Sequence, residues 1–187
     1  CLAVSERLAE IIGNGRMAVV SHPELFQEGS AVSDCQDPVR IVVGSRDSAA
    51  AAAIADLWGR ADVPLVSTDL ETAEMIKQAS NGFLAVKISF INDIARLCDI
   101  FGADVDTVAG GMGLDPRIGK AYLRAGVGFG GSCLPKDLRA LISSAELVGW
   151  NPKILKAALD VNDQQRHLVV ERLKNEIGDL NGRRIGL

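Results

Sequence analysis

Between Asp69 and Phe101 the sequence contains no proline and only one glycine, Gly82. Because these two residues are the main helix breakers, the segment predicts one continuous helix, about 50 Å long. Apolar residues recur at spacings of three and four, which indicates one helical face: Ile76, Ala79, Phe83, Val86, Phe90, Ile94, Leu97 and Phe101. A second face carries Leu84, Ile88, Ile91 and Ala95. A helix that is apolar on two sides must be covered on both, so we expect it to pack against a second copy of the chain.

The residues before this helix alternate between short apolar runs and a helix-length segment. Residues 18–20 and 40–43 are typical of buried strands, and residues 64–67 predict another strand. The alanine-rich stretch from Ser48 to Arg60 predicts a helix. Strands separated by helices indicate a parallel βαβ sheet. No glycine-rich first βα turn is present, so residues 1–68 are interpreted as the tail of a doubly wound dinucleotide-binding domain.

The residues after the long helix predict shorter helices near 105–111 and over 133–147, and a third opened by Asn151-Pro152. That pair suits an N-cap followed by proline at the first helical position. Residues 69–178 are therefore expected to form an all-helical central dimerisation domain. Residues 182–187 have the pattern of a buried strand, and 179–187 are interpreted as the start of a second, truncated α/β domain. Both ends look cut, because Cys1 leads directly into a helical stretch, and an internal fragment is expected.

Composition excludes several classes of function. Hydrophobic residues make up 48% and charged residues 24% of the chain, which is typical of a protein with a buried core. The net charge is −4 with no basic stripe, so nucleic acid is not expected as a partner. No apolar run reaches the roughly 20 residues that span a bilayer, and no signal peptide opens the chain. We therefore expect a soluble, cytoplasmic protein without a membrane partner.

The cysteines and histidines offer little material for a metal site or a histidine-based triad. Four cysteines show no metal-ligand spacing, and His22 and His167 are far apart. Cys98 lies near the apolar faces of the long helix and is expected in the core, whereas His167 is expected to be solvated. Cys1 and Cys35 have no supporting neighbours and are assigned no role.

The strongest chemical signal is the segment Gly126-Val127-Gly128-Phe129-Gly130-Gly131-Ser132-Cys133-Leu134-Pro135-Lys136-Asp137. Its glycines let the backbone approach a ligand closely. Cys133 falls at a predicted helix N-terminus, where the helix dipole favours a thiolate. Lys136 adds positive charge, and Asp137 lies one turn further along the same face. The pattern suits covalent thiol catalysis, and the alternative is a small buried cysteine beside a turn.

Two further pairs carry groups suited to catalysis. Lys77 and Asn81 lie four residues apart on the long helix, where they could donate hydrogen bonds to a developing oxyanion. Their alternative is a solvated helix edge. Glu24 and Glu28 follow Pro23, which suits the first turn of a short helix that would place both carboxylates on one face. One of them could activate water, and the alternative is that both stabilise a helix N-terminus.

A basic group lies beside the glycine-rich segment. Arg117 and Lys120 are separated by Ile118-Gly119, and Arg124 follows. Guanidinium and ammonium groups suit an anionic ligand such as a pyrophosphate. The alternative is ordinary surface charge.

These four segments, in this order, resemble the UDP-glucose/GDP-mannose dehydrogenase family over nearly the whole chain. The segment ending at Asp137 resembles the family's nucleophile signature, Gly-Gly-Ser-Cys-x-Pro-Lys-Asp. Residues 24–29 resemble its Asn-Pro-Glu-Phe-Leu-x-Glu-Gly segment, and residues 77–92 resemble its central helix. His22 stands where the family usually has asparagine, and Leu25-Phe26 reverses its usual order.

The resemblance implies an NAD-dependent, four-electron oxidation of a nucleotide-sugar C6 alcohol to the carboxylate, with UDP-glucose as the expected substrate. GDP-mannose or another UDP-hexose is the alternative substrate, and a non-catalytic helical dimerisation module is the alternative of another class. By likeness, Cys133 would form a thiohemiacetal and then a thioester. Lys77 and Asn81 would stabilise oxyanions, Asp137 would assist the hydrolytic water, and Glu24 would transfer a proton.

The resemblance also implies the binding residues. Glu28 and Lys136 would lie near the nicotinamide. The expected sugar-nucleotide contacts are Leu25, Phe26, Arg117, Tyr122, Arg124, Phe129 and Gly130. Arg117 would reach the site of a neighbouring subunit, so a homodimer would be the functional unit. Because the dinucleotide fingerprint and the second α/β domain are expected outside this sequence, these 187 residues alone are expected to show little turnover.

Overall fold

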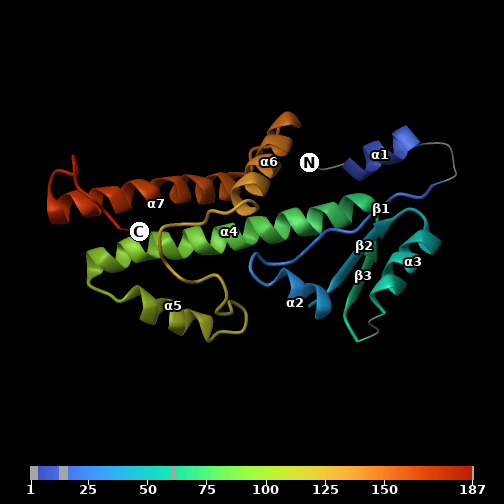
Figure 1. Ribbon diagram of the computed structural model, residues 1–187, viewed down its shortest axis with the longest axis horizontal. Coiled ribbons are helices and arrows are strands. Elements are labelled where there is room, and N and C mark those ends of the chain that lie inside the picture. The colour runs from blue at the N-terminus through green and yellow to red at the C-terminus, as the bar shows by residue number, and fades with distance from the viewer. Residues whose placement is uncertain (1–3, 13–16, 60–61, 187) are drawn as a thin grey trace. The chain divides into compact units, whose positions relative to one another are not determined.

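The computed structural model describes residues 4–12, 17–59 and 62–186. The chain divides into two compact units, Cys1–Ser80 and Asn81–Leu187. The fold is α/β with mostly helical content (Figure 1). Cys1, Arg60 and Leu187, which stand at the ends of predicted elements, lie outside the described residues.

A three-stranded sheet forms the centre of the first unit. β2 (Ile41–Ser45) and β3 (Leu65–Thr68) pair in parallel, with Ile41 opposite Leu65, and α3 (Ser48–Trp58) connects them. This confirms the predicted βαβ arrangement for these elements. α3 begins where the Asp47 carboxylate accepts hydrogen bonds from Ala49 N and Ala50 N. It ends before Gly59, whose left-handed conformation suits a residue without a Cβ.

β1 (Val20–Ser21) corrects the expectation of an all-parallel sheet. It pairs antiparallel with β2, with Val20 opposite Ser45. A parallel neighbour needs a crossover that returns over the sheet, usually through a full helix. Between β1 and β2 the described chain holds only the six-residue α2 (Ala31–Gln36), which is too short for that return.

The core of the first unit lies between β2 and α3. Ile41, Val43, Ala51 and Val63 are buried there, with Val20, Ile54 and Trp58 packed against them. Gly44 leaves room for the chain that enters α4, because an added Cβ would lie 2.4 Å from the Asp69 carbonyl oxygen. The predicted N-terminal helix is confirmed as α1 (Val4–Ile12), where Ser5 Oγ and N both donate to Glu74.

The long predicted helix is confirmed as α4 (Leu70–Phe101), which has 32 residues. α5 (Val105–Gly113), α6 (Leu134–Leu147) and α7 (Lys153–Ile177) follow at the predicted positions, with α6 one residue later than expected. The N-cap expected of Asn151 is wrong, because Pro152 occupies that position and makes no side-chain cap hydrogen bond. The strand expected over residues 182–187 is also wrong for 183–186, which are exposed and have no strand partner among the described residues.

The core of the second unit joins residues of α4, α6 and α7 with Phe129. Its buried members are Ala85, Phe129, Leu138 and Ile142, with Ile88, Leu134, Leu155 and Leu159 packed against them. α7 runs alongside this part of α4 in Figure 1, where Ser89 Oγ donates to the Ala158 carbonyl oxygen at 2.6 Å. Cys98 is buried and His167 is exposed, as predicted.

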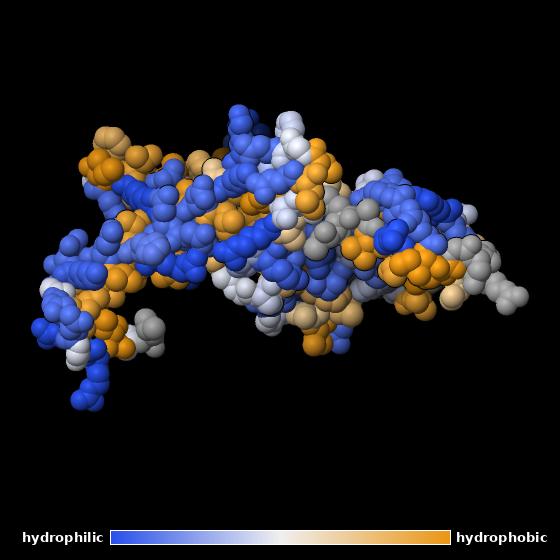
Figure 2. Space-filling view, turned by 90° about the horizontal axis from the view of Figure 1, so that it is seen from above, coloured by the Kyte–Doolittle hydropathy of each residue, from blue (hydrophilic) through white to orange (hydrophobic). Residues whose placement is uncertain are grey.

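The two apolar faces of α4 differ in exposure. On the second face Ile91 is fully buried and Leu84, Ile88 and Ala95 are half-buried. On the first face Phe83 is 65% and Phe101 is 79% exposed. Hydrophobic residues reach the surface of the molecule in several patches (Figure 2). Among the described helices, none is long and apolar enough to cross a membrane.

Candidate active site

Glu24 and Lys77 are brought together in the first unit. Lys77 Nζ donates to Glu24 Oε2 at 2.8 Å, across 53 residues of sequence. The predicted short helix from Pro23 is wrong, because residues 22–27 form no regular element. Glu24 Oε1 instead accepts the backbone N–H of Phe26, and such local side-chain bonds compete with helix formation. Glu24 and Glu28 therefore do not share a helical face.

His22 anchors the segment that carries Glu24. Its Nδ1 lies 2.6 Å from the Val42 carbonyl oxygen, and its Nε2 accepts from Trp58 Nε1 at 3.0 Å. A carbonyl oxygen can only accept and an indole N–H can only donate, so these contacts assign a donor to Nδ1 and an acceptor to Nε2. The two rings meet edge to face, with centroids 5.5 Å apart. His22 departs from the family pattern in sequence, and this double contact is its structural role.

A pocket of about 280 Å³ adjoins Lys77 in the first unit. Ser5, Val20, Ser21, His22, Pro23, Glu74, Lys77 and Gln78 line it. Leu25 and Phe26 are half-buried beside a second pocket of about 130 Å³, and Glu28 is exposed in the turn before α2. Leu25, Phe26 and Glu28 thus lie on the same segment as Glu24, outside the lining of the pocket that holds Lys77.

Cys133 lies at the N-terminus of α6 in the second unit. It is the N-cap residue, it is half-buried, and its carbonyl oxygen accepts the Asp137 backbone N–H at 2.9 Å. Its Sγ lies 3.5 Å from Ser132 Oγ. Pro135 fits in the first turn because that position needs no backbone donor. The helix dipole favours negative charge at this end of α6, as a thiolate nucleophile requires.

Asn81 and Asp137 meet beside this helix terminus. Asn81 Nδ2 donates to Asp137 Oδ2 at 2.8 Å, and Lys136 Nζ lies 3.3 Å from Asp137 Oδ1. Asp137 is only 7% exposed, whereas the Lys136 side chain is open to solvent. A buried carboxylate one turn from a thiol, oriented by an amide, can hold or accept a proton during a reaction at the sulfur.

The basic loop before the glycine segment is held by its own contacts. The Asp115 carboxylate accepts Arg117 Nε at 3.0 Å and a terminal guanidinium nitrogen at 2.6 Å. Hydrogen bonds from Arg117 hold the pKa of the Asp115 carboxyl below its usual value, and the same contact raises the pKa of Arg117. Lys87 Nζ donates to the Ile118 carbonyl oxygen at 3.0 Å, which ties the loop to α4. Asp115 was not among the predicted site residues, although an aspartate two residues before an arginine was a readable signal.

The remaining predicted contacts differ in accessibility. Arg124 and Gly130 are exposed, and Tyr122 is half-buried with a positive φ of 62°. Phe129 is buried in the core, so its side chain is packed against protein rather than exposed to a ligand. Its backbone is bonded to Asn162, which was also absent from the predicted site residues. The available signal was an asparagine one helical turn after Ala158 and Leu159.

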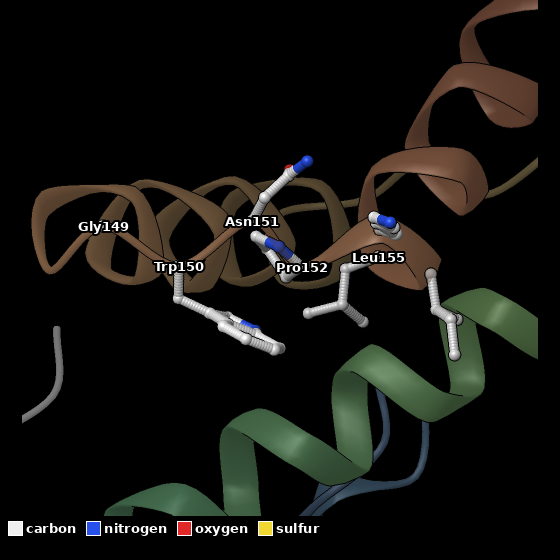
Figure 3. Close-up of a pocket in the computed structure, with 7 residues that line it drawn as sticks. Gly149, Trp150, Asn151, Pro152 and Leu155 are labelled. Carbon is white, nitrogen blue, oxygen red and sulfur yellow. The ribbon is translucent and has the colours of Figure 1, made fainter.

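A separate pocket of about 680 Å³ lies at the turn between α6 and α7 (Figure 3). Residues 149–155 line it, and none is a predicted site residue. The Trp150 side chain points toward α4, whereas Asn151 points away from it. Among the described residues, no three His, Cys, Asp or Glu side chains cluster closely enough to hold a metal ion.

In this α/β fold, a cysteine at the α6 N-terminus lies one turn from a buried carboxylate, an arrangement that thiol catalysis could use. Comparison with known proteins assigns the chain to a family. Residues 71–164 match the model of the UDP-glucose/GDP-mannose dehydrogenase family, central domain. The chain belongs to this family, as the sequence motifs predicted.

Individual relatives agree with this assignment. UDP-glucose 6-dehydrogenase TuaD of Bacillus subtilis is 49% identical over 90% of this chain and 37% of its own length. A UDP-glucose dehydrogenase from Pyrobaculum islandicum superposes with a TM-score of 0.90 at 42% identity, covering 96% of this chain and 42% of that one. A GDP-mannose dehydrogenase from Pseudomonas aeruginosa gives a TM-score of 0.57 at 28% identity, covering 92% and 41%. The chain thus spans about two-fifths of the length of these relatives.

Proposed function

We propose that the protein carrying this sequence oxidises the C6 alcohol of UDP-glucose to the carboxylate, giving UDP-glucuronate, in a four-electron reaction that uses two NAD⁺. One observation carries the proposal: Asn81 orients the buried Asp137 carboxylate one helical turn from Cys133. The likeness to UDP-glucose dehydrogenases supports the substrate. The weaker likeness to a GDP-mannose dehydrogenase makes GDP-mannose, or another UDP-hexose, the second candidate.

The residues of this chain divide the chemistry between them. NAD, when bound, accepts the hydride that leaves C6 in each oxidation. Glu24, already bonded to Lys77, accepts the proton of the alcohol. The Cys133 thiolate adds to the aldehyde carbon to form a thiohemiacetal, whose second oxidation leaves a thioester. Lys77 and Asn81 donate hydrogen bonds to the oxyanions. Asp137 takes a proton from the water that cleaves the thioester, which releases the carboxylate and the thiol.

The exposure of their side chains or backbone supports the binding roles proposed for Lys136 and Phe129. Lys136 is exposed on the first turn of α6, where its ammonium fits the anionic and polar groups of a dinucleotide. Glu28 and Lys136 are proposed to lie near the nicotinamide. The proposed nucleotide-sugar contacts are Leu25, Phe26, Arg117, Tyr122, Arg124, Phe129 and Gly130. Phe129 contributes backbone shape rather than side-chain contact, because its ring is buried.

We also propose the domain assignment made from the sequence. Residues 1–68 belong to the end of the dinucleotide-binding domain, 69–178 to the helical central domain, and 179–187 to the start of a second α/β domain. The parallel unit β2–α3–β3 supports the first assignment. The family match over residues 71–164 supports the second.

The stoichiometry of NADH formation tests the reaction. The full-length protein that carries this sequence is supplied with UDP-glucose, GDP-mannose or another UDP-hexose in separate assays, and NADH is counted per sugar consumed. We expect two NADH per UDP-glucose. Turnover with GDP-mannose alone would keep the proposed mechanism and make GDP-mannose the substrate. Absence of turnover with every nucleotide sugar would leave a non-catalytic helical dimerisation module as the better hypothesis.

A homodimer through α4 is part of the proposal. The exposed aromatic residues Phe83, Phe90 and Phe101 lie on the face of α4 that α7 does not cover. A second copy of the chain would bury this face, as the repeat of apolar residues along α4 requires.

Replacing Phe90 by glutamate should weaken dimerisation at least about 30-fold, because a carboxylate would be buried without a partner at an aromatic contact. Sedimentation of the full-length protein over a range of concentrations measures the effect. Leu57→Glu on α3 is the matched control, since Leu57 is also an exposed apolar residue. A Phe90→Glu variant that dimerises like the unaltered protein would contradict the assignment of this face.

A further inference from the structure

The glycine segment before Cys133 is held from both sides by side-chain amides. Residues 126–131 form no helix or strand, so their backbone groups have no ladder of their own. Asn162 of α7 takes the place of a strand partner for Phe129. Its Oδ1 accepts the Phe129 N–H at 2.6 Å, and its Nδ2 donates to the Phe129 carbonyl oxygen at 3.1 Å. One side chain thus satisfies both backbone groups of one residue, as a facing strand residue does in an antiparallel pair.

Both residues joined by this pair of hydrogen bonds are buried. Asn162 is 4% exposed and Phe129 is 8% exposed, so water does not replace either bond when it is lost. Gly128 allows the approach, since an added Cβ would lie 2.5 Å from Asn162 Oδ1 and its φ is +98°. A side chain at position 128 would therefore push the amide away from Phe129. The glycine and the asparagine are two parts of one contact.

Two more amides hold the start of the segment. Asn92 Oδ1 of α4 accepts the Gly126 N–H at 2.8 Å, and Gln165 Nε2 of α7 donates to the Gly126 carbonyl oxygen at 2.7 Å. Asn92 is fully buried, and its Nδ2 has no partner among the residues that the structure describes. A buried, unpaired donor lowers stability. Asn92 nevertheless holds Gly126 in position through the hydrogen bond at its Oδ1.

We infer that Asn162 is a positioning residue: it sets the backbone of residues 126–129 in the shape that receives the nucleotide sugar. The inference rests on the proposed function, which gives this segment its ligand. Phe129 packs in the same core as Leu134 and Leu138 of α6, so its position also determines how the chain enters Cys133. The side-chain amide of Asn162 is hydrogen-bonded to the Phe129 backbone, and we expect its effect to be on binding more than on chemistry.

The test separates binding from catalysis in the full-length protein. Asn162→Leu keeps the approximate size of the side chain and removes both hydrogen bonds. Asn162→Asp keeps an acceptor for the Phe129 N–H but turns an oxygen toward the Phe129 carbonyl oxygen. Asn175→Leu, at an exposed position on the same helix, is the matched control. Hydrogen exchange of the Phe129 amide is measured together with KM and kcat for UDP-glucose.

We expect Asn162→Leu to speed exchange at Phe129 and to raise KM, each about tenfold or more, with a smaller change in kcat. Asn162→Asp should raise KM while protecting the Phe129 amide better than leucine does. If Asn162→Leu does not fold, Asn162→Asp and Gln165→Leu test the same positioning role, and both should raise KM. Faster exchange with unchanged KM, or a loss confined to kcat, overturns the inference. Unaltered protein without turnover on any nucleotide sugar overturns the proposed function and the inference with it, whatever the exchange rates.

Discussion

Cys133→Ser should lower the rate of four-electron oxidation at least about 10³-fold. The serine hydroxyl is far less nucleophilic than a thiolate, and no described group other than Ser132 Oγ is bonded to the Cys133 sulfur to activate a replacement. A first oxidation to the aldehyde stays chemically possible without the thiol. Residual NADH should therefore not exceed one per sugar. The measurement is NADH formed per UDP-glucose by the full-length protein.

A second cysteine supplies the control for this prediction. Cys35 lies exposed on α2 as a free thiol, and Cys35→Ser should leave the rate and the stoichiometry unchanged. The substitution at Cys133 is nearly isosteric and half-buried, so the melting temperature should stay near that of the unaltered protein. Two NADH per sugar from Cys133→Ser would remove the thiol from the mechanism.

Asp137→Asn should trap the thioester on Cys133. The substitution preserves the shape and leaves an oxygen that accepts from Asn81 Nδ2, but it removes the basic carboxylate. Both oxidations precede hydrolysis, so NADH should form in a burst of up to two per site. Steady turnover should then be slower by about 10²-fold or more, the usual contribution of a general base. Rapid mixing measures the burst, and intact mass after acid quenching detects the acylated protein.

The exposed Asp160 on α7 provides the matched aspartate for this experiment. Asp160→Asn should show neither a burst nor an acylated protein under the same conditions. If Asp137→Asn turns over at the original rate, or slows without accumulating acylated protein, the hydrolytic role belongs to another group.

The local sequence pattern was sufficient to predict the helices and strands whose apolar residues recur at a regular spacing. The absence of breakers and the repeat of apolar residues predicted a helix over 69–101, and α4 spans Leu70–Phe101. The alternation of apolar runs with a helix predicted the parallel pair β2 and β3. Cys133 was predicted at a helix N-terminus, and it is the N-cap residue of α6. These features depend on neighbours within one or two turns, which the sequence displays directly.

Other features depend on partners that are distant in sequence. Pro23 begins no helix, because Glu24 bonds to Phe26 N and to Lys77. The direction of β1 was set by the short connection to β2 rather than by its own apolar residues. Periodicity also could not tell which apolar face of α4 is covered within the chain. α7 covers the face that contains Ile88 and leaves Phe83 exposed.

The sequence by itself determined the long helix, the helix-terminal thiol and the family motif that contains it, because each is a local arrangement of adjacent residues. Only the tertiary structure decided that Asn81 orients Asp137 across 56 residues and that Asn162 supports Phe129 across 33. A hydrogen bond requires its two atoms within about 3 Å and in line, and the packing of helices sets that geometry. Residue types and spacing state which groups can bond, and packing determines which of them do.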